Sequence, residues 1–547
     1  MGSSTLAWAQ MPPPAGNPID TLPQAIPLPS PDWELPAQSN PTPEVDRNLQ
    51  PAYTLEQELQ VNNIQISGVS ALPFEDIAEI FQPLSGTRTT IAALTQAVAQ
   101  ATQVYQRAGF PLSFAYLPEQ NFANGIVQVN VVEGHLKQAV LQGDPGKSEK
   151  LLRTMVQPML EQKPLNQAVF EHQTLLLSRL AHLQVSASAA PPTSTDGGTP
   201  LLLQLDRNPV LFNLGADLRK GDPKAVATLT FNEPLWSGSQ WQFSSLIDNW
   251  NKERFVSVTL NQSLNAYGTR LSISASDFKG QDNFAGNQLQ DTTAQKRLSI
   301  GVTHPLLLSN AESSVVGANL FGLNYQKIYE FPLFNLSLSD QEKVRALQVL
   351  WDWQKRQPHS QQSANLSFTQ GINALGARIE RSPFLEKNNA KLDFSRLAFD
   401  YALHWRAPSL WGAGFAMGGQ ASPHSLPTSE RISFGSTRFG RGYRSGEAAG
   451  DQGLGVSFEA NRLFIFKNGT WLKSIEPYIL YEQARTWFHQ AGWQGQKIQS
   501  SSIGLKLSDG KHYAIDLAMS KPHGDKSPYN PDQKLRYSMT LTYQFGQ

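Results

Sequence analysis

The chain of 547 residues contains no cysteine, little charge and no long apolar run. Without cysteine no disulfide can form, which is compatible with a cell-envelope protein that must avoid stray disulfides. Charged residues make up 16% of the chain, against about a quarter in ordinary soluble domains. Lysine plus arginine equals aspartate plus glutamate at 45 each, so the net charge gives no reason to expect a nucleic acid as partner.

The missing apolar run bears on how the chain could meet a membrane. A helix that spans a bilayer needs about 18 or more consecutive apolar residues, and this sequence has no such segment. Every backbone group in lipid needs a partner within the protein, so a membrane protein without such helices must be a closed β-barrel.

Patterns of catalytic chemistry are also missing. The ten histidines show no metal-ligand spacing, and neither H-E-x-x-H nor G-x-S-x-G occurs. The segment Gly143–Ser148 superficially resembles a phosphate-binding loop, but Leu141 stands where the first glycine would be required. Pro145 also removes one N–H that would hold a phosphate, so we interpret the segment as a turn. We expect no enzyme activity, no metal and no cofactor.

Two segments at the N-terminus differ from the rest. Ala7-Trp8-Ala9 has the A-x-A pattern of an export-signal cleavage site, so residues 1–9 are predicted to be a signal remnant, with a chance match as the alternative. Residues 10–55 are rich in proline, which disfavours helix and sheet, and are predicted to form an extended linker.

Residues 56–207 contain a pattern that occurs twice. The order strand, helix, helix, strand, strand is predicted for residues 56–134 and again for residues 135–207, so the two form an internal repeat. The predicted elements of the first module are Asn63–Ile66, Phe74–Phe81, Thr89–Arg107, Leu112–Leu117 and Ile126–Val132. Those of the second are Leu136–Leu141, Leu151–Leu160, Pro164–Leu183, Val185–Ala189 and Leu201–Leu205.

From residue 208 to residue 547 the period changes to two. The final strand, Leu535–Phe545, places leucine, tyrosine, methionine and phenylalanine on one face and polar residues on the other, as expected between lipid and water. About sixteen strand-like segments predict a mainly β fold with a sixteen-stranded transmembrane barrel; an array of soluble β-sandwiches is the alternative. The segments are Leu211–Leu218, Val226–Phe231, Trp241–Ile247, Phe255–Leu260, Leu271–Ala275, Leu298–Val302, Val315–Tyr325, Val344–Trp353, Leu366–Ile372, Leu392–Trp405, Gly412–Met417, Leu454–Leu463, Ile475–Tyr481, Ile503–Leu507, Tyr513–Met519 and Leu535–Phe545.

A long connection, residues 421–451, separates the eleventh and twelfth predicted strands. Connections of this length are usually functional or disordered. It contains Phe439-Gly440-Arg441-Gly442-Tyr443, in which glycines on both sides let the backbone approach a wall closely. Arg441 would suit a bidentate pair with a carboxylate inside the barrel. A solvated loop with incidental arginines is the alternative.

These features resemble a known family, the outer-membrane transporters of two-partner secretion (TpsB, the hemolysin secretion/activation proteins). The family belongs to the superfamily of POTRA-bearing barrels, which includes the BamA insertases. The resemblance covers the chain from about residue 56 and also involves Tyr105–Phe110, Leu117–Gln120, Asn124–Val127 and Val131–Gly134 in the first module. The pentapeptide around Arg441 is similar to the tip of the family's sixth loop.

The resemblance implies a site, a location and partners. It implies that Arg441 meets an acidic residue on the inner wall, where Glu482 stands at the position usually held by aspartate. It implies a monomer in the outer membrane of a Gram-negative-type cell, with both POTRA modules in the periplasm. Its partners would be membrane lipid, the barrel-assembly machinery during biogenesis, and a secreted exoprotein with an N-terminal secretion domain.

The implied function is export of that exoprotein, unfolded and without nucleotide, after recognition by the POTRA modules. A segment of the exoprotein would bind as an additional strand at an exposed strand edge of a module. The candidate surfaces are Leu183–Ala189 and the second helix of the first module. The cargo could be a hemolysin, an adhesin, a contact-dependent toxin or a heme scavenger. A barrel insertase, a passive porin and a lipolytic barrel are the alternative functions.

Overall fold

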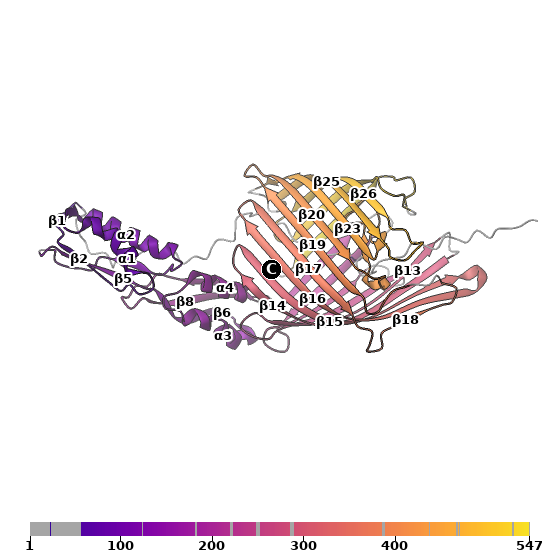
Figure 1. Ribbon diagram of the computed structural model, residues 1–547, viewed down its shortest axis with the longest axis horizontal. Coiled ribbons are helices and arrows are strands. Elements are labelled where there is room, and N and C mark those ends of the chain that lie inside the picture. The colour runs from indigo at the N-terminus through magenta and orange to yellow at the C-terminus, as the bar shows by residue number, and fades with distance from the viewer. Residues whose placement is uncertain are drawn as a thin grey trace, which may run out of the picture.

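In the computed structural model, two small α/β modules lie in line at one end of a large β-barrel (Figure 1). The structure describes Leu22 and residues 56–545, apart from residues 123, 181–182, 219–222, 248–251, 285–288, 386–388, 437, 467–468, 470 and 528–529. The predicted signal remnant and, except for Leu22, the predicted proline-rich linker lie outside the described residues. None of the described helices is long and apolar enough to cross a bilayer.

The first module is a three-stranded sheet covered by two helices. Its sheet has the order β2-β5-β4, with β2 parallel to β5, and its helix α2 buries one apolar face that includes Leu94, Val98 and Tyr105. A ribbon of β1 and β3, too short for a period-two pattern to show, lies beside it. The elements are β1 (Glu58–Gln60), β2 (Asn63–Ser67), α1 (Phe74–Phe81), η3 (Gln82–Leu84), β3 (Arg88–Thr90), α2 (Ile91–Arg107), β4 (Phe114–Tyr116) and β5 (Ile126–Val132).

The second module repeats this plan, which confirms the internal repeat. Its sheet order β6-β8-β7, with β6 parallel to β8, matches the order in the first module. Helix α4 is shorter than predicted because the side chain of Asn166 accepts the N–H of Ala168 and so begins the helix after Pro164. The elements are β6 (His135–Gly143), η4 (Gly146–Ser148), α3 (Glu149–Leu160), α4 (Gln167–Ser178), β7 (Leu183–Ala189) and β8 (Gly198–Arg207).

The two modules are joined by direct contacts. Leu112, from the first module, is fully buried in the hydrophobic core of the second. The carbonyl oxygen of Gly109 accepts the N–H of Gln167 at 2.9 Å, and that of Gly134 accepts the N–H of Leu165 at 2.9 Å. These contacts fix the orientation of one module against the other.

Glu133 joins two of the motifs that resemble the family, because its side chain contacts Tyr105 of the other motif. Its half-buried carboxylate accepts the N–H groups of Ser70 and Ala71, both at 2.7 Å, and the hydroxyl of Tyr105 at 2.9 Å. Burial alone would raise the pKa of Glu133, but hydrogen bonds from Ser70, Ala71 and Tyr105 outweigh it and hold the pKa below its usual value. The carboxylate thus ties α2 and the loop after β2 to the end of β5.

The barrel consists of sixteen spanning strands in antiparallel pairs, closed by β28 against β9. Each corresponds to one of the sixteen predicted segments, so the predicted fold class is confirmed. The short strands β18 (Arg378–Arg381) and β24 (Phe464–Ile465) pair beside them. The spanning strands are β9 (Val210–Asp217), β10 (Lys224–Asn232), β11 (Ser239–Leu246), β12 (Glu253–Ser263), β13 (Arg270–Phe284), β14 (Leu289–Leu308), β15 (Glu312–Phe331), β16 (Leu336–Gln357), β17 (Ser360–Gly371), β19 (Ser395–Arg406), β20 (Trp411–Ala421), β23 (Gln452–Arg462), β25 (Ser474–Trp487), β26 (Lys497–Ser508), β27 (Tyr513–Pro522) and β28 (Arg536–Phe545).

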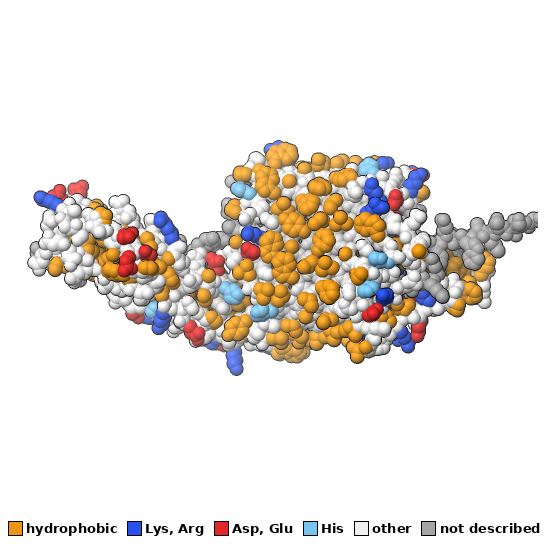
Figure 2. Space-filling view, viewed as in Figure 1, with side chains coloured by type: hydrophobic (Ala, Val, Ile, Leu, Met, Phe, Trp, Pro, Cys, Tyr) orange, Lys and Arg blue, Asp and Glu red, His pale blue; other side chains and the backbone are white. Residues whose placement is uncertain are grey.

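The outer wall of the barrel is apolar. On β28, Tyr537 and Phe545 are 62% and 65% exposed, whereas Thr542 on the opposite face is fully buried. Figure 2 shows hydrophobic side chains over the visible barrel wall and charged ones mainly towards its two ends. The predicted assignment of one face to lipid and the other to the interior is therefore confirmed.

Three strands are much longer than their predicted segments. β14 and β15 have 20 residues each and β16 has 22, about twice what a tilted strand needs to cross a bilayer. The predicted segments covered only the apolar part of each strand, because the outer halves carry polar residues on both faces.

We predict that Glu133→Gln destabilises the first module at neutral pH. An amide offers one acceptor oxygen in place of two, so we expect a loss of about 1–2 kcal/mol after screening at a half-exposed site. Because the folded pKa is lowered, the stabilisation is present above the unfolded pKa of about 4.3 and is lost as pH falls through the folded value. Pulse proteolysis of the full-length protein at pH 7 and at acidic pH measures the difference.

The exposed carboxylate of Glu119 provides the control. Glu119→Gln should leave the stability of the module unchanged at both pH values. Equal stability of the two variants at pH 7 would contradict the role assigned to Glu133.

Candidate functional site: the long loop inside the barrel

The predicted connection 421–451 corresponds to residues 422–451 between β20 and β23, which fold back into the barrel and are called the long loop below. It forms a hairpin of β21 (Ile432–Phe434) and β22 (Ala448–Gly450). Its apolar side chains build a cluster against the barrel wall, where Ala484 of β25 and Ile498 of β26 complete it. The long loop is therefore a packed element with its own core.

Arg441 lies at the tip of the long loop and pairs with the inner wall. Its Nη1 is 2.8 Å from Oδ2 of Asp516 on β27 and 2.5 Å from the hydroxyl of Tyr478 on β25. The hydroxyl of Tyr478 in turn donates to Oδ1 of Asp516 at 2.7 Å. The side chains of Arg441 and Asp516 are only 17% and 10% exposed, so this ion pair is largely shielded from water.

Glu482, the residue that the sequence suggested as partner of Arg441, makes a different contact. Its carboxylate accepts the backbone N–H of Arg441 at 2.8 Å and the hydroxyl of Ser500 at 2.9 Å. The ion pair of the guanidinium is with Asp516 instead. Alternation on β27 would have shown Asp516 as the one carboxylate on the inward face, between Ala514 and Ala518.

The residues on either side of Arg441 fit the loop closely against the wall. A Cβ on Gly442 would lie 2.9 Å from the backbone nitrogen of Pro522, and one on Gly440 would lie 2.6 Å from Cδ1 of Ile498. Phe439 packs edge-on against the ring of Phe434 at 5.9 Å. The hydroxyl of Tyr443 accepts the N–H of Gly524 at 2.9 Å and donates to the carbonyl of Asp525 at 3.1 Å.

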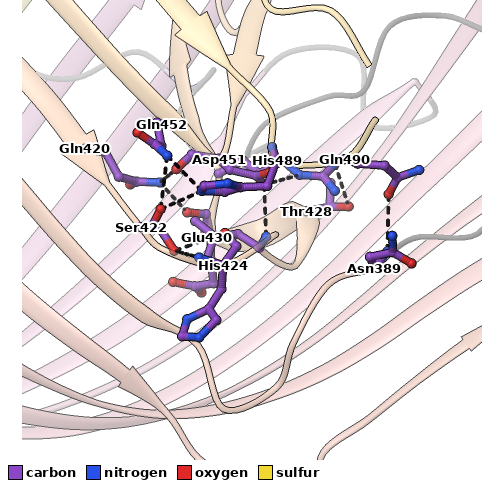
Figure 3. Close-up of polar contacts among 12 residues, drawn as sticks. Asn389, Gln420, Ser422, His424, Thr428, Glu430, Asp451, Gln452, His489 and Gln490 are labelled. Carbon is purple, nitrogen blue, oxygen red and sulfur yellow. Dashed lines mark hydrogen bonds and ion pairs between the residues drawn. The ribbon is translucent and has the colours of Figure 1, made fainter. Parts of the chain in front are cut away.

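A second set of polar contacts holds the base of the long loop (Figure 3). The carboxylate of Asp451 accepts the N–H of Leu426 and the N–H of His489, both at 2.9 Å. The amide of Gln420 donates to the carbonyls of Glu430 and Asp451 at 3.0 and 3.1 Å. His489 belongs to the connection between β25 and β26, so this connection is tied to the loop base.

The loop is also attached to the opposite wall. Glu342 on β16 is fully buried and accepts the N–H of Thr428 at 2.7 Å and its hydroxyl at 3.1 Å. In the ring of sixteen, β16 is the eighth strand and β27, which carries Asp516, is the fifteenth. The long loop therefore bridges nearly opposite sides of the lumen.

Other candidate chemistry finds no support in the described part of the chain. No group of three or more histidine, aspartate or glutamate side chains is placed to hold a metal ion there. The segment Gly143–Ser148 runs from the end of β6 to the turn η4, directly before α3.

A closed sixteen-stranded barrel with two N-terminal α/β modules and a loop folded into its lumen is the architecture of the POTRA-bearing outer-membrane barrels. Residues 59–134 match the family model "POTRA domain, ShlB-type", and residues 335–507 match "Haemolysin secretion/activation protein ShlB/FhaC/HecB". These matches identify the chain as a two-partner secretion transporter of the outer membrane, with its POTRA modules in the periplasm.

Relatives agree with this assignment over most of the chain. Outer membrane transporter CdiB of Escherichia coli is 24% identical over 441 residues, which cover 76% of this chain and 70% of that protein. Heme/hemopexin transporter protein HuxB of Haemophilus influenzae is 20% identical over 500 residues, covering 86% and 84%. The solved structure of CdiB from Escherichia coli has a TM-score of 0.66 at 20% identity and covers 94% of each chain, which supports the fold.

We predict that Asp516→Asn loosens the tip of the long loop. Removing one partner of a buried ion pair costs about 3 kcal/mol or more, so a shielded position in the loop should become reactive at least about tenfold faster. Ala448 is fully buried. The chain has no cysteine of its own, so Ala448→Cys labelled with a maleimide reports on the loop alone.

Two further variants make the measurement specific. Asp532→Asn removes an exposed carboxylate from the connection between β27 and β28 and should leave labelling unchanged. Glu482→Gln keeps one acceptor for the backbone N–H of Arg441 and should have a smaller effect than Asp516→Asn. If Asp516→Asn labels no faster than Asp532→Asn, the ion pair does not hold the loop.

Proposed function

We propose that this chain exports one large partner exoprotein, which enters unfolded from the periplasm and passes through the barrel lumen beside a displaced long loop. The observation that carries the proposal is the long loop itself, a folded element that bridges the lumen and is held by non-covalent polar contacts. Such contacts can break and re-form during transport, whereas a passive pore would need no element of this kind. The partner class is an exoprotein with an N-terminal secretion domain.

Capture is proposed to take place on open strand edges of the POTRA modules. β7 pairs with β8 along one edge, and its other edge is not paired with any strand in the described part of the chain. β2 is likewise at the edge of the first sheet. An unfolded segment that adds a strand to either edge gains main-chain hydrogen bonds, and the alternating side chains of the edge select among segments.

The energy for export is proposed to come from folding of the partner outside the cell. The segment that resembled a phosphate-binding loop is occupied by contacts to the barrel, which leaves the proposal without a nucleotide-driven step. We further propose that the chain works as a monomer without enzyme activity, and that the barrel-assembly machinery inserts it into outer-membrane lipid. HuxB, by its name, transports heme/hemopexin, and CdiB is an outer membrane transporter; the cargo of this chain stays a choice among the four predicted kinds.

We predict that Arg441→Ala leaves the barrel assembled but reduces secretion of the partner by about tenfold or more. The variant leaves Asp516 buried without its partner, at a cost of about 3 kcal/mol, and the released loop obstructs the lumen in other positions. Partner protein in the medium is measured by immunoblotting, and barrel assembly by the heat-dependent shift in gel mobility. The exposed Arg378 supplies the control variant Arg378→Ala.

Normal secretion by Arg441→Ala would contradict the role of the loop. Deletion of the whole gene separates the proposed function from that of an insertase. Loss of a single secreted protein supports export, whereas depletion of many outer-membrane proteins would support insertion.

A further inference from the structure

The segment Gly143–Ser148, which only superficially resembles a phosphate-binding loop, nevertheless binds an anion. It lies where the second POTRA module meets the barrel, directly before helix α3. The anion is the carboxylate of Glu233, in the connection between β10 and β11. This connection lies at the barrel end nearest the modules.

Glu233 is held by contacts from both sides of the junction. Its Oε2 accepts the N–H of Lys147 at 3.1 Å, and its Oε1 accepts the N–H of Gly238 at 2.8 Å and a short hydrogen bond from the hydroxyl of Ser148. Only 2% of the residue is exposed. The carboxylate therefore joins the module to the barrel in a place that water does not reach.

Positively polarised groups lie close to the carboxylate of Glu233. Helix α3 has 12 residues, and its N-terminus carries the positive end of the helix dipole. The ammonium group of Lys147 lies at the same junction and donates to the carbonyls of Pro234 and Leu235 at 2.9 and 3.1 Å. A Cβ on Gly146 would lie 2.9 Å from Oε2 of Glu233, so the glycine gives the carboxylate room.

The backbone of Glu233 is itself unusual. Its φ angle of 51° lies in the left-handed region, which side-chain-bearing residues adopt at a cost. Glycine would adopt this conformation at a lower cost in free energy. The hydrogen bonds of the Glu233 side chain, and not its backbone conformation, therefore account for a glutamate at this position.

Further contacts surround this junction. Nη2 of Arg270, at the start of β13, donates to the carbonyl of Arg179 at 2.6 Å, and Leu308, at the end of β14, is buried in the core of the second module. Only residues 208 and 209 separate β8 of the module from β9 of the barrel. The second module is thus fastened to several consecutive turns of the barrel.

We propose that Glu233 is a positioning residue for export, whose carboxylate fixes the second POTRA module so that a strand captured on it is delivered to the lumen. The inference rests on the proposed function and adds a separate step to it. Capture depends on the strand edges of the modules, whereas delivery depends on where the modules stand relative to the barrel. Loss of Glu233 should therefore separate delivery from capture.

The test uses full-length Glu233→Gly, which removes the carboxylate and relieves the left-handed backbone. Spin labels on Lys150→Cys in α3 and Tyr267→Cys in the connection between β12 and β13 report the distance between module and barrel. We expect a narrow distance distribution in the parent protein and a broad one in Glu233→Gly. We also expect export to fall about tenfold, with binding of the partner's secretion domain changed less than about twofold.

Sodium acetate tests whether the missing element is an anion. Added acetate should narrow the distance distribution of Glu233→Gly more than an equal concentration of chloride does, because a carboxylate matches the two N–H donors and the hydroxyl. Equal effects of the two salts would overturn the assignment of an anion-binding segment.

Two more variants separate positioning from folding. Gly146→Ala introduces a Cβ close to the carboxylate and strains the turn at φ 59°, both on the module side. It leaves the barrel unchanged and should reproduce the broad distribution and reduced export. Glu149→Gln removes an exposed carboxylate from the first turn of α3 and should change neither. The heat-dependent gel shift identifies any variant whose barrel is not assembled, and Gly146→Ala then provides the test.

Failure of the positioning role and failure of the proposed export function give different experimental results. A narrow distribution in both Glu233→Gly and Gly146→Ala, or a broad one with unchanged export, would overturn the positioning role while leaving export intact. If the parent protein itself exports no partner, the proposed function fails, whatever the spin labels show.

Discussion

The closure of the barrel is the constraint on which the rest of this structure depends. Strands in lipid must pair on both edges, and β28 meets this requirement by pairing with β9. A ring of sixteen strands encloses more space than the side chains of its wall can fill, as in porins of similar size. If the lumen of the closed barrel were left unfilled, small solutes would cross the membrane through it. Folding the long loop into the lumen fills that space with a packed element and explains its hydrophobic cluster and buried polar groups.

The strength of the loop's attachment follows from where its polar contacts lie. Buried charges lose hydration, so an ion pair such as that of Arg441 and Asp516 contributes little net stability while it is intact but is costly to break on one side only. On the opposite wall, the buried carboxylate of Glu342 holds the loop through hydrogen bonds from Thr428, without an ion pair between the two. In the proposed export, a passing chain that offers its own polar groups would replace such partners one at a time. The loop therefore has a defined position in the lumen, and in the proposed function it can still be displaced from it.

Much of the fold could be predicted from the sequence, because about sixteen strand-like segments recurred and alternation, where it was clean, reported the face of each residue. Alternation does not report how far a strand extends along the barrel axis or how it is paired in register with its neighbours. These two properties account for the features that the sequence did not predict. The lengths of β14 to β16 were missed because their outer halves leave the apolar zone. The ion-pair partner of Arg441 depends on which inward carboxylate lies level with the loop tip, and strand tilt and register place Asp516 there. Glu482, on β25, reaches the loop backbone instead.

Carboxylates that accept main-chain N–H groups recur at several places where the chain is neither helix nor sheet. Glu133 binds the loop after β2, Glu233 binds the turn before α3, Glu342 and Asp451 bind the base of the long loop, and Glu482 binds its tip. Irregular backbone shielded from water carries donors that no strand or helix satisfies, and a carboxylate offers two oxygens with four acceptor sites. In a chain with only 16% charged residues, these five carboxylates act at joints between regular elements. In the proposed function these joints must move or hold still during transport, so the same few side chains would determine both the stability of the fold and the path of the exported chain.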